Sequence, residues 1–227
     1  MISRVLSAAI LAGLLAGLVV TLVQFAKVTP LILQAEVFEV AVPGSAAAAA
    51  PETAPAAQGV FDDMERAAMT LGANLITGMG FALVLASAIL FSGRAVTLRS
   101  GAVWGLAGFL VVALAPALGL APELPGAPEI DLASRQLWWG GTVLATAAGG
   151  ALTVLKGGPV FSALGIALIA LPHVIGAPQP ESHTAFFPAG LAADYAAASL
   201  AAAAIFWLVL GAATGWTLSR CAPSEPA

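Results

Sequence analysis

The chain has 227 residues, of which 60% are hydrophobic and only 9% are Asp, Glu, Lys or Arg. A mean hydropathy of +0.98 is too high for a soluble domain of this size. The net charge of −4, without a basic cluster, argues against nucleic-acid binding. A single cysteine, Cys221, excludes an intrachain disulfide and a cysteine-based zinc site.

Apolar runs of about 20 residues recur along the chain, and each is long enough to cross a hydrocarbon core of roughly 30 Å. A spanning segment must satisfy its own backbone in lipid, which favours helices, and the runs lack the alternation of a membrane barrel. The sequence therefore predicts an all-α, polytopic integral membrane protein whose residues 1–227 form one membrane domain. About six transmembrane helices are expected, at approximately 5–26, 67–91, 101–120, 137–155, 160–175 and 191–218.

The first apolar segment follows Arg4 and resembles both a transmembrane helix and a secretory signal peptide. Its apolar run of about 22 residues is longer than the roughly 7–15 residues of a signal-peptide core. We therefore expect a retained helix. Lys27 and Pro30 are expected to end it, with Lys27 reaching back to the membrane surface.

A second polar feature follows Pro30, where Glu36 and Glu39 lie three residues apart. If the helix resumes after the proline, both carboxylates share one face. They are candidates for cation binding, and the alternative is a solvated loop face. Residues 42–59 are rich in Ala, Pro and Ser and are expected to form a flexible linker outside the cytoplasm.

The later segments carry few polar residues. The third is expected to kink or end at Pro116. The fourth begins with Trp138 and Trp139, which are typical of an aromatic anchor at the membrane surface, and Arg135 before them is most simply a snorkelling anchor. Three pairs of glycines four residues apart indicate close helix packing, within this chain or against a partner: Gly13 and Gly17, Gly101 and Gly105, and Gly211 and Gly215.

The distribution of charge predicts that both termini are cytoplasmic. Five basic residues then lie inside and three outside, with the inner ones in short loops where the positive-inside rule applies. The same topology places eleven of the twelve acidic residues outside, including those of a proline-rich loop at 121–136. This acidic bias has two open explanations: solubility of the loops, or a negative field that concentrates cations at an outer mouth.

The stretch Leu171–His183 concentrates possible cation ligands in an otherwise apolar chain. It holds His173, Glu181 and His183, and imidazole and carboxylate groups suit divalent cobalt, nickel and zinc. The ordinary alternative is a histidine that is only hydrogen-bonded at a helix end. Three prolines are expected to break any helix in this stretch: Pro172, Pro178 and Pro180.

Catalytic motifs such as HExxH, GxSxG and the P-loop do not occur in the sequence, so an enzyme is not expected. Without a nucleotide-binding motif, any transport would depend on an ion gradient, a membrane potential or a separate energising subunit.

Three stretches together resemble the CbtA family: RVLSAAILAGLLAGLVVTLVQ…VTPLILQAEVFE, RQLWWGGTVLATAAGGAL and LPHVIGAPQPE. That family is described as the probable cobalt transporter subunit, usually encoded with a small one-helix partner, CbtB, that has a histidine-rich tail. The resemblance implies that five residues handle the cation: Glu36, Glu39, His173, Glu181 and His183. It also implies a structural or partner-facing role for Arg135, Trp138 and Trp139.

The expected function is therefore that of a permease subunit for uptake of divalent cobalt, located in the bacterial cytoplasmic (inner) membrane. The cation is captured at an outer mouth of acids and histidine and passes between helices lined by Asn74 and the threonines of the fourth segment (Thr142, Thr146 and Thr153). Cobalt(II) is the transported ion, and no structurally bound cofactor is expected. The alternative is a membrane scaffold that assembles or stabilises the one-helix partner without itself conducting ions.

Overall fold

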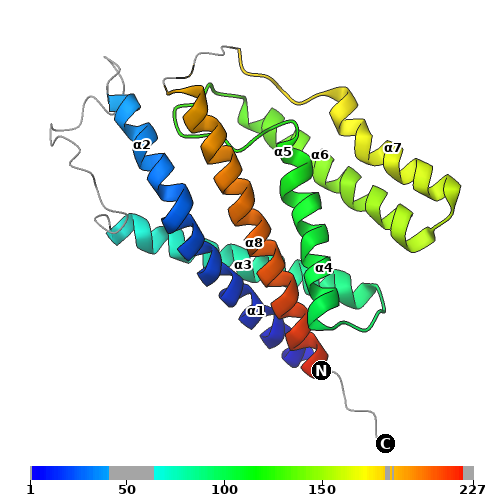
Figure 1. The fold of residues 1–227 in the computed structure, drawn as a ribbon. Coiled ribbons are helices and arrows are strands. Elements are labelled where there is room, and N and C mark those ends of the chain that lie inside the picture. The colour runs from blue at the N-terminus through cyan, green and yellow to red at the C-terminus, as the bar shows by residue number, and fades with distance from the viewer. Residues whose placement is uncertain (1, 41–63, 182–184, 186, 222–227) are drawn as a thin grey trace, which may run out of the picture.

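The computed structural model describes residues 2–40, 64–181, 185 and 187–221, and this part of the chain is helical, without strands (Figure 1). The elements in chain order are α1 (Ile2–Val23), the π-helical turn η1 (Gln24–Val28), α2 (Thr29–Val40), α3 (Met64–Phe91), α4 (Leu98–Phe109), the π-helical turn η3 (Leu110–Leu114), α5 (Ala115–Ala117), α6 (Leu132–Ala151), the π-helical turn η4 (Leu152–Lys156), α7 (Pro159–Ile175) and α8 (Ala189–Cys221). The predicted linker at 42–59 lies outside the described residues.

Four helices in the described part are long and apolar enough to cross a membrane: Ser3–Phe38, Met64–Phe91, Leu98–Ala117 and Ala189–Arg220. The apolar helix α7 has 17 residues, which corresponds to roughly 26 Å at 1.5 Å per residue. The prediction of an all-α, polytopic membrane protein is confirmed. The count of six spans stays a prediction.

The first helix does not end at Lys27 and Pro30, and that expectation is wrong. The helix runs without a break through α1, η1 and α2, because a π-helical turn precedes the proline. At its end the Thr29 N–H donates to the Gln24 carbonyl, one residue further back than in an α-helix. The wider turn accommodates a proline that cannot donate and whose ring crowds the preceding turn.

The span made of α4, η3 and α5 uses the same arrangement. The turn η3 ends just before Pro116, and the Ala115 N–H donates to the Leu110 carbonyl. In both helices the donor is the residue immediately before the proline, and the acceptor lies five residues further back. Here the helix ends soon afterwards, at Ala117.

Helix α8 forms the centre of the bundle, with α1 on one side and α4 on another, while α3 crosses behind (Figure 1). The pair α6 and α7 forms a hairpin beside this group. The start of α1 and the end of α8 lie at the same end of the bundle. At the opposite end lie the end of α2, the start of α8, the end of α7 and the loop between α5 and α6.

The predicted glycine pairs all lie where two backbones touch within this chain. A Cβ atom on Gly13 would lie 2.5 Å from the Met79 Cα on α3, and one on Gly101 would lie 2.7 Å from the Gly215 Cα on α8. A further contact joins the hairpin, since a Cβ on Gly149 would lie 2.5 Å from the Gly165 carbonyl oxygen. Small residues let helices approach closely in lipid, where packing replaces the hydrophobic effect as the source of association.

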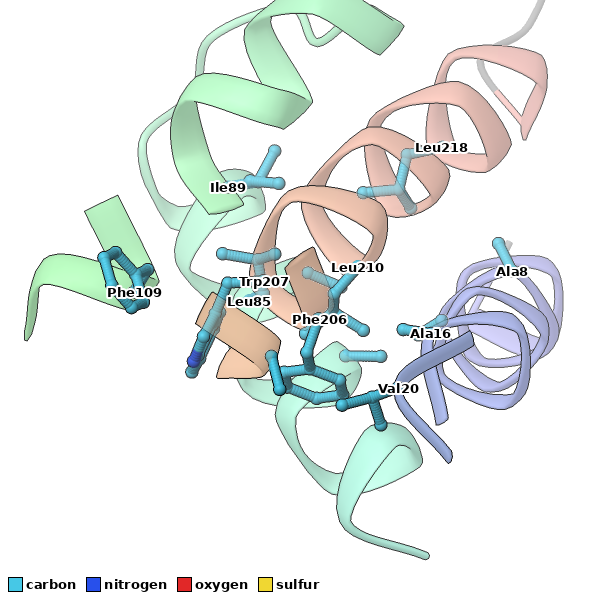
Figure 2. Packing of buried hydrophobic residues seen from close by; sticks show 14 of the residues in the cluster. Ala8, Ala16, Val20, Leu85, Ile89, Phe109, Phe206, Trp207, Leu210 and Leu218 are labelled. Carbon is cyan, nitrogen blue, oxygen red and sulfur yellow. The ribbon is translucent and has the colours of Figure 1, made fainter. Parts of the chain in front are cut away.

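The larger side chains fill the space between α1, α3, α4 and α8, as Figure 2 shows. Ile89 of α3 and Leu210 of α8 are fully buried there. The Phe81 ring of α3 lies 5.0 Å from the Trp207 ring and 6.2 Å from the Phe206 ring of α8, measured between centroids. These tilted and edge-on contacts fix α8 against α3.

We predict that Gly211→Val destabilises the bundle, because a Cβ there would lie 2.6 Å from the Gly105 Cα of α4. Such overpacking typically costs about 1–3 kcal/mol. The measurement is the thermal unfolding midpoint of the detergent-purified protein.

Gly80→Val on α3 is the matched control, since a Cβ at Gly80 meets nothing within 4 Å. Equal losses of stability in the two variants would show that the contact between α4 and α8 does not control the packing.

Candidate cation-binding vestibule

A broad pocket of about 1150 Å³ opens at the end of the bundle where α2 ends and α8 begins. We call it the acidic pocket. Its wall consists of the loop between α5 and α6, the start of α6, part of the segment after α7, and one residue of α8: Glu123, Leu124, Pro125, Gly126, Ala127, Pro128, Glu129, Ile130, Asp131, Leu132, Arg135, Gln179, Glu181 and Tyr195.

Four carboxylates and one guanidinium line this pocket, which gives its wall a net charge of −3. Arg135 forms an ion pair with Glu123, so this basic residue offsets one of the four acids. The carboxylates of Glu129, Asp131 and Glu181 carry the excess charge. A concave surface lined by charges of one sign raises the local concentration of counter-ions.

A small hydrophobic cluster holds the pocket wall in place. Leu124, in the middle of the proline-rich loop, is only 3% exposed and packs with Ala35 of α2 and Phe187 before α8. Tyr195 of α8 packs against the same cluster. The acidic loop is thus fixed to both α2 and α8, two elements that are far apart in the sequence.

Asp131 also caps helix α6. One carboxylate oxygen accepts hydrogen bonds from the Ser134 N–H at 2.9 Å and from the Ser134 hydroxyl at 2.8 Å. These bonds favour the ionised form and lower the pKa of Asp131 below its ordinary value of 3.8. Asp131 therefore contributes its negative charge throughout the neutral range.

The segment containing His173 and Glu181 folds differently from the expectation. Pro172 does not break the helix: α7 continues to Ile175, and the Gly176 N–H donates to the Pro172 carbonyl at 3.0 Å. The helix ends at Gly176, whose φ of 91° suits glycine. The helix continues past Pro172 because a proline in the last turn removes only one of the helix's hydrogen bonds.

His173 and Glu181 consequently lie in different surroundings. The half-buried His173 ring packs edge-on against the Trp138 ring of α6, with 6.0 Å between centroids. The buried indole Nε1 of Trp138 has no hydrogen-bond partner among the described residues. Glu181 is exposed and lines the acidic pocket, whereas His173 does not. His183 lies outside the described residues.

The two predicted carboxylates of α2 lie in its last turns. Glu36 accepts a hydrogen bond and forms an ion pair at 2.6 Å with Arg66 of α3. Glu39 lies in the final turn of the helix. In the described part of the chain no three His, Cys, Asp or Glu side chains converge closely enough to hold a metal ion.

The other predicted residues have structural contacts. The Trp138 ring covers Gly119 and leaves no room for a Cβ there. Trp139 is 43% exposed and lines a separate groove between α5, α6 and α8. Glu129 and Asp131 line the pocket but were not among the site residues predicted from the sequence. The acidic and proline-rich composition of their loop is the signal that could have identified them.

Asn74 and the threonines of the fourth segment, which were expected to line one passage, make separate contacts in the structure. Asn74 of α3 donates to the Thr21 hydroxyl at 3.0 Å and to the Gln24 side-chain oxygen at 2.6 Å, which links it to α1 and η1. The Thr142 hydroxyl donates to the carbonyl of its own helix at Trp138. Among the described residues α3 and α6 make no contact, and a passage lined by both sets of residues stays a prediction.

The apolar helices and the internal glycine contacts define a polytopic α-helical membrane protein, and an acidic pocket opens at one end of its bundle. The family model of CbtA, described as the probable cobalt transporter subunit, matches residues 2–219, and the chain belongs to this family. The resemblance seen in the sequence is thereby confirmed. No curated protein and no solved structure matches the chain.

We predict that Asn74→Leu weakens the contact between α1 and α3, because the Thr21 and Gln24 side chains lose their common donor. Interhelical hydrogen bonds in membranes average about 0.6 kcal/mol and reach about 1.7 kcal/mol. Reversible unfolding in mixed micelles measures the loss. Thr77→Val, an exposed change on the same helix, is the control, and an equal effect would contradict the assignment.

A second prediction concerns the cap of α6. Asp131→Ala should speed hydrogen–deuterium exchange at residues 133–136, whereas Asp131→Asn should preserve protection because its side-chain oxygen still accepts from Ser134. Since the folded pKa of Asp131 is lowered, the charged cap is present at neutral pH and is lost as the pH falls through that lowered value. Wild-type protection that disappears near pH 6 would contradict this account.

Proposed function

We propose that the chain is a permease subunit for the uptake of divalent cobalt, with the acidic pocket as the outer mouth where the hydrated ion is captured. Membership of a cobalt transporter family and the −3 charge of the pocket wall support this proposal. The single observation that carries it is the gathering of Glu129, Asp131 and Glu181 around one open pocket.

Capture in such a pocket is electrostatic at first. Carboxylates on an open wall attract a divalent ion through its water shell, and the exposed Glu181 is well placed to replace one water. His173 lies eight residues earlier in the same segment and offers nitrogen ligation after capture, while Glu36 and Glu39 of α2 are further candidates for handling the ion. Mixed nitrogen and oxygen ligation suits cobalt and nickel better than copper(I).

The orientation that we propose places both termini in the cytoplasm of a bacterial inner-membrane protein. The start of α1 and the end of α8 lie at one end of the bundle, and the acidic pocket lies at the other. The description of the family as a subunit implies a partner, and we propose a small one-helix CbtB-type subunit with a histidine-rich tail.

A scaffold that assembles this partner without conducting ions is the second candidate. The exposed apolar side chains of α6 and α7 favour it, since Leu137, Leu144 and Val174 are all more than 70% exposed. The glycine pairs that the sequence suggested for this purpose are occupied by contacts inside the chain.

Cobalt uptake distinguishes these functions. We predict that Glu129→Gln/Glu181→Gln lowers the initial rate of radiolabelled cobalt uptake about tenfold at low ionic strength, and that added salt narrows this difference. The chain would be expressed with its partner in cells lacking other cobalt transporters, at matched membrane levels. Glu65→Gln is the control, because Glu65 is exposed but does not line the pocket.

The outcomes separate the two candidates. A normal rate of cobalt uptake in the double variant would show that the acidic pocket does not lie on the transport path. Uptake that needs the chain but is insensitive to every pocket variant, together with loss of the partner from membranes lacking the chain, would favour the scaffold.

A further inference from the structure

A second cavity lies at the end of the bundle opposite the acidic pocket. This groove of about 360 Å³ runs between the start of α1 and the end of α8, and we call it the basic groove. Its wall is formed by Ser3, Arg4, Ser7, Ala8, Leu11, Trp216, Thr217 and Arg220. Among these described residues are two guanidinium groups and no carboxylate, so their side chains carry two positive charges.

The guanidinium of Arg220 is held in a defined orientation. Its central carbon lies 4.1 Å from the centroid of the Trp216 ring, which is a cation–π contact. A cation–π contact does not use the N–H donors in the guanidinium plane, so these donors can still bind another group. They match the two oxygens of a phosphate group, which arginine binds through two parallel hydrogen bonds.

The basic groove also lies where two apolar spans end, which is where a lipid headgroup is expected. Arg4 is at the beginning of the first apolar helix, and Arg220 is the last residue of the apolar stretch of α8. Trp216 is 44% exposed, as is typical of aromatic residues at a membrane surface. Towards the bilayer the wall becomes apolar, with Ala8 buried and Leu11 61% exposed, and this surface can accept an acyl chain.

We propose that the basic groove binds an anionic phospholipid, with the phosphate between Arg4 and Arg220 and an acyl chain along Leu11. Basic pockets between transmembrane helices bind anionic headgroups in this way. The lipid would join the two ends of the chain, where the Thr217 hydroxyl already contacts the Ala8 carbonyl at 3.3 Å. Its leaflet would be the cytoplasmic one in the orientation proposed above, but binding itself does not depend on the transport function.

Native mass spectrometry of the detergent-purified chain tests this inference. The protein would be incubated with phosphatidylglycerol or with zwitterionic phosphatidylcholine, and the retained lipid counted. We expect one phosphatidylglycerol to be retained in preference to phosphatidylcholine, and Arg4→Gln/Arg220→Gln to lower its retention about tenfold or more. Arg4→Lys/Arg220→Lys, which keeps the charge but loses the planar donors, should give an intermediate result.

Arg94→Gln/Arg99→Gln is the matched control, because Arg94 in the loop after α3 and Arg99 in the first turn of α4 are exposed and do not line the groove. An equal loss of lipid in this control would overturn the proposal, since the effect would then reflect total charge. A thermal unfolding midpoint raised as much by inorganic phosphate as by phosphatidylglycerol would also overturn it. Stabilisation by phosphatidylglycerol alone, absent in the Arg4→Gln/Arg220→Gln protein, would support it.

Discussion

The direct contact between the backbones of α4 and α8 is the constraint on which the rest of the structure depends. Gly101 and Gly105 face Gly211 and Gly215, and each position lacks room for a Cβ atom. Lipid tails are as apolar as leucine side chains, so helices in a membrane gain little from hiding apolar groups and must gain from close packing. This contact fixes the path of α8, whose start lines the acidic pocket and whose end lines the basic groove.

These cavities divide the charge of the protein between its two ends. Tyr195, near the start of α8, lines a pocket with net charge −3, and Arg220, near its end, lines a groove whose described side chains carry two positive charges. The core between them is made of apolar side chains and glycine contacts, with Asn74, Thr21 and Gln24 as a hydrogen-bonded polar cluster. In the proposed function this arrangement attracts cations to one end, and in the proposed lipid site it leaves the other end suited to an anionic membrane surface.

The sequence predicted the helical membrane class well, because long apolar runs have few alternatives in lipid. It failed at Pro30, where local rules end a helix, since the π-helical turn before the proline depends on one shifted hydrogen bond. Local sequence rules also failed at the candidate site. His173 and Glu181 are close in sequence, but α7 continues past Pro172 and directs His173 towards Trp138.

Contacts between segments that are distant in the sequence account for the remaining differences between the predicted and the observed site. The pairing of Glu36 with Arg66 joins residues thirty positions apart, and Leu124 holds the acidic loop through Ala35 and Phe187. Neither contact has a signature in local composition. The acidic loop itself was visible in the sequence, and only its position beside Glu181 required the structure.

Equilibrium binding of cobalt(II) to the purified chain in lipid nanodiscs tests the central claim most directly. The account predicts binding that weakens steeply with ionic strength and is strongly reduced when Glu129 and Glu181 are replaced together by glutamine, because the pocket attracts the ion through charge. Binding that is insensitive to salt and unchanged in that variant would contradict the account and place the cobalt site elsewhere in the protein.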